Sequence, residues 1–387
     1  MQYKKITNLQ VCGGGDGIRT QKPVLDFINY YRALVILWVV SGHTMIWGRD
    51  TIYASNFYFF TGATYLFVFI SGFLFQYLSH KYDYLTYIKK KLTNVIMPFI
   101  IITIPVALAY TFSDPNISTY CDGAPKLFRF LICFLQGSII NQPMWYMGMI
   151  TVFFLLAPLF IKIQKNKMIL IAVTFCSIIY TLKTNRLPVP FPELDTGIAN
   201  IVLTNIIFYI KQFLYFASAY LIGMLSCYLI EEYGEIIKSK AKPIFYILLT
   251  CFSFDFIFHI YFLKLSFLNV SLQKIIESLL LLFFFIAFER EIKNNKIIDK
   301  TLNFLADYSF GIFFVHSLFL NIIYCKTIYM PLAFGVPEFV HYNTLKAFLF
   351  CTGLYFSVLF LSVFYLWLMK KILNLLRIKN TRMFIGV

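Results

Sequence analysis

Charge is scarce in this chain. Asp, Glu, Lys and Arg together make up 13% of its 387 residues, whereas hydrophobic residues make up 59%. Soluble globular domains carry about 25% charged residues, so this composition excludes that class. The mean hydropathy of +0.73 instead predicts a polytopic membrane protein.

Acidic residues are scarcer than basic ones, with 18 Asp and Glu against 34 Lys and Arg, which leaves a net charge of +16. A basic chain can bind nucleic acid, but these Lys and Arg residues stand in short clusters between apolar segments. That arrangement is typical of the loops that orient membrane proteins and contact anionic lipid. We therefore expect membrane lipid, and no nucleic acid, among the partners.

Motifs for metals and phosphate loops are also missing. The eight cysteines stand singly, without a Cys-x-x-Cys pair or an adjacent His, which argues against a metal site and a disulfide framework. The glycine-rich run VCGGGDGIRT lacks the Lys and Ser or Thr of a phosphate loop. It lies within residues 1–24, which are polar, do not resemble a cleavable signal, and are expected to form a flexible tail.

Ten long apolar segments predict an all-α fold of about ten transmembrane helices. With the N-terminus inside, 23 Lys and Arg residues fall in the inner connections and 9 in the outer ones. Because cytoplasmic loops retain basic residues, both termini are expected in the cytoplasm. The transmembrane domain would cover 25–377, followed by a cytoplasmic tail at 378–387. The apolar segments are 27–47, 57–79, 92–112, 145–163, 168–183, 204–230, 244–262, 270–288, 308–328 and 345–369.

The first of these segments carries two ionisable side chains, Arg32 and His43, which are costly in hydrocarbon. They are eleven residues apart, so on a helix they share a face and lie about 16 Å apart along its axis. The predicted topology puts Arg32 near the cytoplasmic side and His43 deeper. Arg is suited to binding phosphate and His to proton transfer, although an interfacial anchor and a satisfied interior His would give the same pattern.

Five phrases of the sequence resemble, in order, those of the integral-membrane acyltransferase family called acyltransferase 3. The first contains the Arg and His that the family implicates in acyl transfer, separated by ten residues. Together they extend the resemblance over about 25–377, nearly the whole chain. The phrases are YYRALVILWVVSGHT, FVFISGFLFQYL, YIKKKLTNVIMPF, MWYMGMITVFFLLAPLF and SFGIFFVHSLF.

The sequence departs from the family pattern at two places. Many members have an Arg-x-x-Arg on the third segment, and the corresponding positions here are Lys91 and Asn94. Some branches carry two Glu residues on the helix that begins with Trp and Tyr, and here 148–154 contains no carboxylate. The chain is therefore expected to belong to the branch without that acidic phrase.

The resemblance implies that His43 is catalytic, as a general base or as an acyl-histidine nucleophile. It implies that Arg32 is also a catalytic-site residue and contacts the phosphates of acetyl-CoA, the acyl donor. Lys91 is a second candidate for that contact by its position. Ser71 is a further candidate for the donor site, although Ser71 and Gly72 would equally serve close helix packing. Lys91 would otherwise be a topogenic charge.

Four residues are candidates for binding the acceptor. Trp145 and Tyr146 could line a pocket or form an aromatic belt at the interface. Lys211 lies alone in an apolar run and could line the site or extend to the membrane surface. His316, in the last phrase, could line the same cavity. These four residues complete the predicted site.

A pair of opposite charges is expected on the segment 270–288. Glu277 can pair with Lys274, three residues earlier on the same helix face, or with Lys211.

The resemblance implies a membrane O-acyltransferase, with O-acetyltransferase the expected activity, in the bacterial cytoplasmic (inner) membrane. It would move an acyl group from cytoplasmic acyl-CoA to a hydroxyl of an extracytoplasmic glycan or lipid-linked saccharide, without a metal. The alternatives are a transporter or flippase for lipid-linked saccharides and a catalytically silent partner protein. The acceptor sugar, the length of the acyl group and the oligomeric state stay open.

Overall fold

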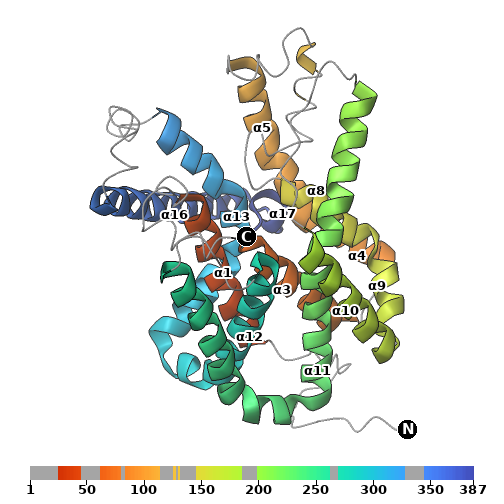
Figure 1. Ribbon diagram of the computed structural model, residues 1–387. Helices are drawn as coiled ribbons and strands as arrows, with labels where there is room; N and C mark the ends of the chain where they lie inside the picture. The colour runs from red at the N-terminus through yellow and green to blue at the C-terminus, as the bar shows by residue number, and fades with distance from the viewer. Residues whose placement is uncertain are drawn as a thin grey trace, which may run out of the picture.

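A computed structural model describes residues 25–44, 62–79, 83–113, 125–127, 130, 145–184, 198–261, 269–326 and 344–387. Every regular element within these ranges is helical, which confirms the all-α prediction. The helices surround α1 and α3, which lie near the middle of the molecule (Figure 1). The elements are α1 (Asp26–Thr44), α3 (Thr64–Leu78), α4 (Tyr84–Lys91), the π-helical η3 (Leu92–Ile96), α5 (Met97–Ser113), α8 (Trp145–Leu155), α9 (Ala157–Gln164), α10 (Lys167–Lys183), α11 (Ile198–Tyr261), α12 (Val270–Asn294), α13 (Lys296–Lys326), α16 (Thr344–Leu375) and α17 (Arg382–Ile385).

Short polar side chains begin several of these helices. The Asp83 carboxylate accepts a hydrogen bond from the Thr86 amide at 2.9 Å and caps α4. The side chain of Asn166 accepts from the first amides of α10, and that of Asn269 accepts from the Ser271 amide at 2.8 Å. Such caps satisfy amides that have no partner within the helix, so these polar residues fix where each helix starts.

The long helix α11 is bent. A straight helix of its 64 residues would extend about 96 Å, roughly three times the thickness of membrane hydrocarbon. At Tyr233 the backbone leaves helical geometry, with φ of −122° and ψ of 27°, and the two arms turn back at the lower end of Figure 1. The predicted segments 204–230 and 244–262 fall on these two arms as far as Tyr261, with charged residues between them.

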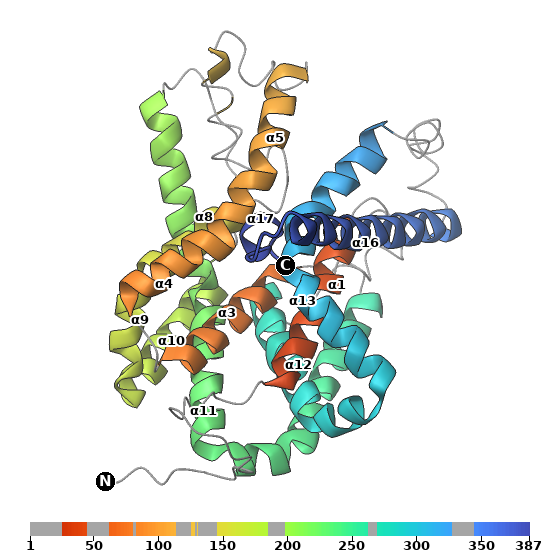
Figure 2. The ribbon, with the colours of Figure 1, turned by 180° about the vertical axis from the view of Figure 1, so that it is seen from behind.

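Four helices in the described part of the chain are long and apolar enough to cross a membrane. They lie in α11, α12, α13 and α16, and the pair α8 and α9, bent by 54°, would make a fifth. These helices fit a membrane protein, while the number of about ten spans and the location of the termini stay predictions. In Figures 1 and 2, α16 crosses the other long helices steeply.

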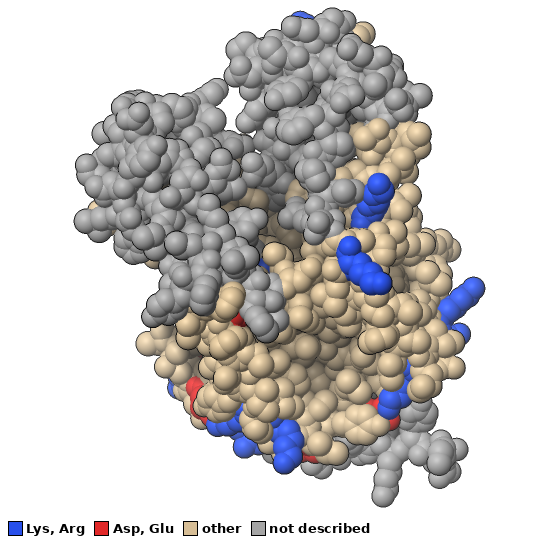
Figure 3. Space-filling view, in the orientation of Figure 1, with Lys and Arg blue, Asp and Glu red and all other residues tan. Residues whose placement is uncertain are grey.

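Large apolar side chains cover much of the outer surface. Phe360 on α16, Ile247 on α11 and Phe175 on α10 are each more than 60% exposed. In Figure 3 the middle of the visible face is almost free of charged residues, whereas Lys and Arg lie beside Asp and Glu along its lower rim. Exposed apolar surface of this extent is expected where a protein contacts lipid.

Helices α3 and α11 pack backbone against backbone through two glycines. A Cβ added to Gly72 would overlap the carbonyl oxygen of Tyr220, and one added to Gly223 would overlap the carbonyl oxygen of Phe69. Gly72 therefore serves close helix packing, one of the two roles expected for it.

We expect Gly72→Ala to lower the free energy of unfolding by about 1–3 kcal/mol or more, because the methyl group would force the two backbones apart. The matched control is Gly234→Ala, whose added Cβ would have no atom within 4 Å. Thermal unfolding in detergent measures both. Equal stability of the two variants would contradict the close packing of α3 on α11.

Candidate active site

Two histidines from distant parts of the chain face each other. The ring centroids of His43 on α1 and His316 on α13 are 5.3 Å apart, with an angle of 42° between the ring planes. His316 is fully buried, and its Nδ1 lies 3.0 Å from the carbonyl oxygen of Ile312. Because a carbonyl oxygen only accepts, Nδ1 carries the proton and Nε2 is left as an acceptor. Nε2 has no hydrogen-bond partner within the described residues.

Arg32 contacts the same helix. Its Nη2 donates to the carbonyl oxygen of Ala306 at 3.0 Å and to the Ser309 hydroxyl at 3.1 Å. Ser309 and His316 both lie on α13, in the sequence SFGIFFVH. Arg32 and His43, which share one face of α1, therefore both contact this part of α13. An Arg side chain has five N–H donors, and among the described residues only the two on Nη2 have an acceptor, so those on Nη1 and Nε can bind another group.

Further polar contacts hold α1 against α13. The Tyr30 hydroxyl donates to the Asp299 carboxylate at 2.6 Å, and the Asn29 amide donates to Asn303 at 3.4 Å. The contacts advance along both helices in the same direction, from Tyr30 and Asp299 to His43 and His316. Helices α1 and α13 are therefore parallel neighbours, a pairing of segments that lie more than 250 residues apart.

Aromatic rings connect the histidines to the Trp-containing helix α8. The ring of Phe313 lies 6.2 Å from His316 and 5.1 Å from Tyr146, measured between centroids. Ser71 on α3 lies close enough to Tyr146 to act on its hydroxyl, and the Ser71 hydroxyl itself donates to the Phe67 carbonyl oxygen at 2.9 Å. We call His43, His316, Phe313, Tyr146 and Ser71 the histidine cluster.

The Trp145 ring lies beside this cluster, 6.5 Å from Tyr146 and 5.7 Å from Phe216 between centroids. It is 5% exposed, so it is a buried residue in the helix core. Trp145 therefore borders the cluster from the side of α11.

Lys91 lies at the end of α4, just before the apolar segment 92–112. Its Nζ stands over the rings of Tyr87 and Phe154, at 5.3 and 5.0 Å from their centroids. Burial, followed by the positive charge of Arg382, lowers the pKa of Lys91 to about 8. Arg382 also acts on Arg32, together with the carboxylate of Asp307.

Arg382 was missed by the reasoning from sequence. It lies on α17, beyond the five phrases, in a stretch whose basic residues looked like those of any cytoplasmic tail. Its position beside Arg32 and Lys91 depends on how the chain folds back, which no local pattern in the sequence indicates.

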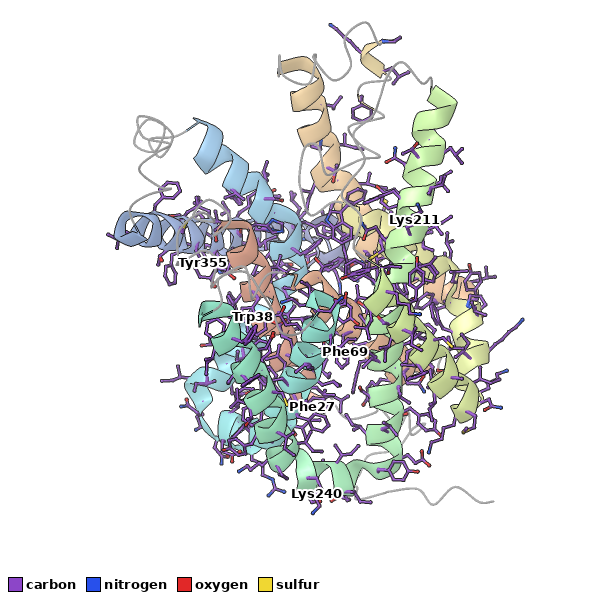
Figure 4. The ribbon with its side chains drawn as sticks, in the orientation of Figure 1. Phe27, Trp38, Phe69, Lys211, Lys240 and Tyr355 are labelled. Atoms are coloured by element: carbon purple, nitrogen blue, oxygen red, sulfur yellow. The ribbon has the colours of Figure 1, made fainter. Side chains whose placement is uncertain are left out.

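The structure does not bring every candidate to the cluster. Lys211 is exposed on the arm of α11 that points upward in Figure 4, and no contact joins it to the histidines among the described residues. Within the described residues there is also no group of three His, Cys, Asp or Glu side chains that could hold a metal ion.

The arrangement combines a proton acceptor, an aromatic wall and cations. The imidazole of His43 can take a proton near neutral pH, and the Nε2 atom of His316 can accept a hydrogen bond beside it. Arg32 carries positive charge toward the other end of α1, and Lys91 adds a second cation at the end of α4. This set of groups suits the transfer of a group from an anionic donor to a hydroxyl.

A comparison with protein families agrees with this chemistry. The family model Acyl_transf_3, described as an acyltransferase domain, matches residues 25–367. That range contains the whole histidine cluster, Arg32 and Lys91, and ends before α17. No curated protein and no solved structure matches the chain.

Proposed function

Because the chain belongs to the acyltransferase 3 family, we propose that this membrane acyltransferase is an O-acetyltransferase of the bacterial inner membrane. It would take the acetyl group from cytoplasmic acetyl-CoA and pass it to a hydroxyl of an extracytoplasmic or lipid-linked glycan. The observation that carries this proposal is the contact between His43 and His316 on the same pair of helices that holds Arg32.

His43 is proposed to act as the general base. It takes the proton of the acceptor hydroxyl while the hydroxyl oxygen attacks the carbonyl carbon of the thioester. The carbon–sulfur bond then breaks, and the CoA thiolate leaves and regains a proton. The alternative, an acyl group carried briefly on His43, uses the same groups and releases CoA before the hydroxyl attacks.

His316 is proposed as a positioning residue for this step. Because its Nδ1 is held by the Ile312 carbonyl, its Nε2 presents a lone pair in a buried place beside His43. That lone pair can accept a hydrogen bond from the N–H of His43 or from the acceptor hydroxyl, which would orient the reacting groups. Tyr146 and Trp145 would pack against the acceptor sugar.

Arg32 and Lys91 are proposed to bind the phosphates of the donor, and Ser71 would lie between the donor and the aromatic wall. Arg binds phosphate through paired, charge-assisted hydrogen bonds, while Lys supplies a point charge. The donor would then extend from these cations toward His43. Lys211 is left out of the proposed acceptor site because it is exposed on α11.

We expect Arg32→Ala to weaken binding of acetyl-CoA by about tenfold to a hundredfold, since hydrogen bonds to charged groups contribute about 1.5–3 kcal/mol. The turnover of bound donor should change by less than about threefold. The control is Asn29→Ala, which also removes a polar tie between α1 and α13 but no charge. An unchanged donor affinity in Arg32→Ala would mean that Arg32 only ties the two helices together.

The function itself is tested in membranes. Membranes from cells with and without the gene are supplied with acetyl-CoA labelled in the acetyl group, and label is measured in the glycan fraction. We expect label only when the protein is present, while unacetylated glycan still reaches the surface of the deleted strain. Unacetylated glycan that fails to reach the surface would favour a transporter and contradict the proposal.

A further inference from the structure

The last residues of the chain fold back onto the site. After α16 ends at Leu375, Arg377 takes a φ of 57°, and the Ile378 amide donates to the Leu373 carbonyl at 3.0 Å. This reversal directs residues 378–387 toward the middle of the molecule, where Figures 1 and 2 mark the chain end. These residues, predicted to form a cytoplasmic tail, pack against the helices.

The folded-back segment contacts α13 at Gly311, in the sequence SFGIFFVHSLF that also contains His316. A Cβ added to Gly311 would lie 2.8 Å from the Ile385 carbonyl oxygen and 2.6 Å from the Val387 side chain. Ile385 is 2% exposed, and α17 also packs on α5 and on η3, which directly follows Lys91. Because Gly311 has no side chain, the folded-back segment can pack directly against α13, the helix that Arg32 contacts.

Three cations gather where this segment lies. Arg382 is the first residue of α17, which packs on η3 directly after Lys91, and the same segment packs on Gly311 of the helix that Arg32 contacts. In this arrangement the positive charge of Arg382 acts on Arg32 and on Lys91, and the carboxylate of Asp307 acts on Arg32 and Arg382. None of the three cations forms an ion pair with a carboxylate in the part of the chain that the structure describes.

Arg32 and Lys91 are half-buried and Arg382 is exposed, and bringing these three positive charges together opposes folding through their mutual repulsion. The carboxylate of Asp307 offsets only part of that repulsion. Binding of an anion that carries several negative charges is therefore favoured beside these cations. The diphosphate and the 3′-phosphate of coenzyme A supply such charges.

We propose that Arg382 binds the phosphates of acyl-CoA together with Arg32 and Lys91, so that the folded-back segment 378–387 is part of the donor site. This inference rests on the proposed function, which supplies acyl-CoA as the donor. It adds a binding residue that lies outside the range matched by the family model, 25–367.

The test is the binding of coenzyme A to the purified full-length protein in detergent, measured by calorimetry. We expect Arg382→Gln to raise the dissociation constant about tenfold. The matched control is Lys379→Gln, which removes an exposed charge from the same segment and should change the constant by less than about twofold. Equal constants for Arg382→Gln and wild type would overturn the inference.

A second variant tests the inference even if the substitution at Arg382 disturbs the folding of residues 378–387. Asp307→Asn removes the neighbouring carboxylate from an exposed position on α13, so coenzyme A should bind about twofold to fivefold more tightly. Unchanged or weaker binding by this variant would contradict the inference even if Arg382→Gln fails to fold. Absence of binding to the wild-type protein would instead contradict the proposed function.

Discussion

Replacing His43 with Ala is expected to lower the rate of acyl transfer about a hundredfold to ten-thousandfold, the contribution of a positioned general base. The imidazole lies beside the buried acceptor nitrogen of His316, where it is the group proposed to take the proton of the acceptor hydroxyl. Affinity for coenzyme A should change by less than about twofold, because the proposed phosphate site lies at the other end of α1. Rates are measured with labelled acetyl-CoA and the glycan acceptor.

The control for this variant is Gly42→Ala, the neighbouring position on the same helix. A Cβ at Gly42 meets no atom of the described residues within 4 Å, so both the rate and the affinity should stay close to those of the wild type. A His43→Ala protein with full activity would rule out both the general base and the acyl-histidine mechanism.

The second large effect is expected on stability. Lys274 and Glu277 on α12 form an ion pair at 2.6 Å, and their side chains are 5% and 0% exposed. Replacing Lys274 with Met would leave a carboxylate buried without its cation, at a cost of about 3–5 kcal/mol in the free energy of unfolding. Chemical unfolding in detergent measures this loss.

The double variant Lys274→Met with Glu277→Leu separates the loss of the pair from the loss of packing. Because both charges are gone, we expect most of the lost stability to return. A single variant as stable as the wild type, or a double variant no more stable than the single one, would show that the pair is not a buried electrostatic unit.

Local features of the sequence were enough to predict several parts of the fold. The Lys274–Glu277 pair follows from a spacing of three on one helix, and it is confirmed. The first apolar segment, predicted over 27–47, is the helix α1 as far as Thr44, and residues 45–47 lie outside the described ranges. Both features depend only on residues that are close together in the chain, so they can be predicted from the sequence alone.

Contacts between distant segments could not be predicted in the same way. The sequence named His43 and His316 separately, but their contact depends on α1 lying parallel to α13. Arg382 has no helical or motif pattern that would place it beside Arg32. Lys211 was selected because a charge costs free energy in hydrocarbon, yet an exposed Lys can extend along the helix to the membrane surface.

The central claim is that this protein itself transfers acetyl groups from acetyl-CoA, with His43 at the reacting centre. The most direct measurement uses the purified protein in lipid nanodiscs, with acetyl-CoA labelled in the acetyl group and the isolated glycan as acceptor. We expect label in the glycan with the wild-type protein and almost none with His43→Ala, although both bind coenzyme A. A wild-type protein that binds coenzyme A but transfers no label, or a His43→Ala protein that transfers as fast as the wild type, would contradict it.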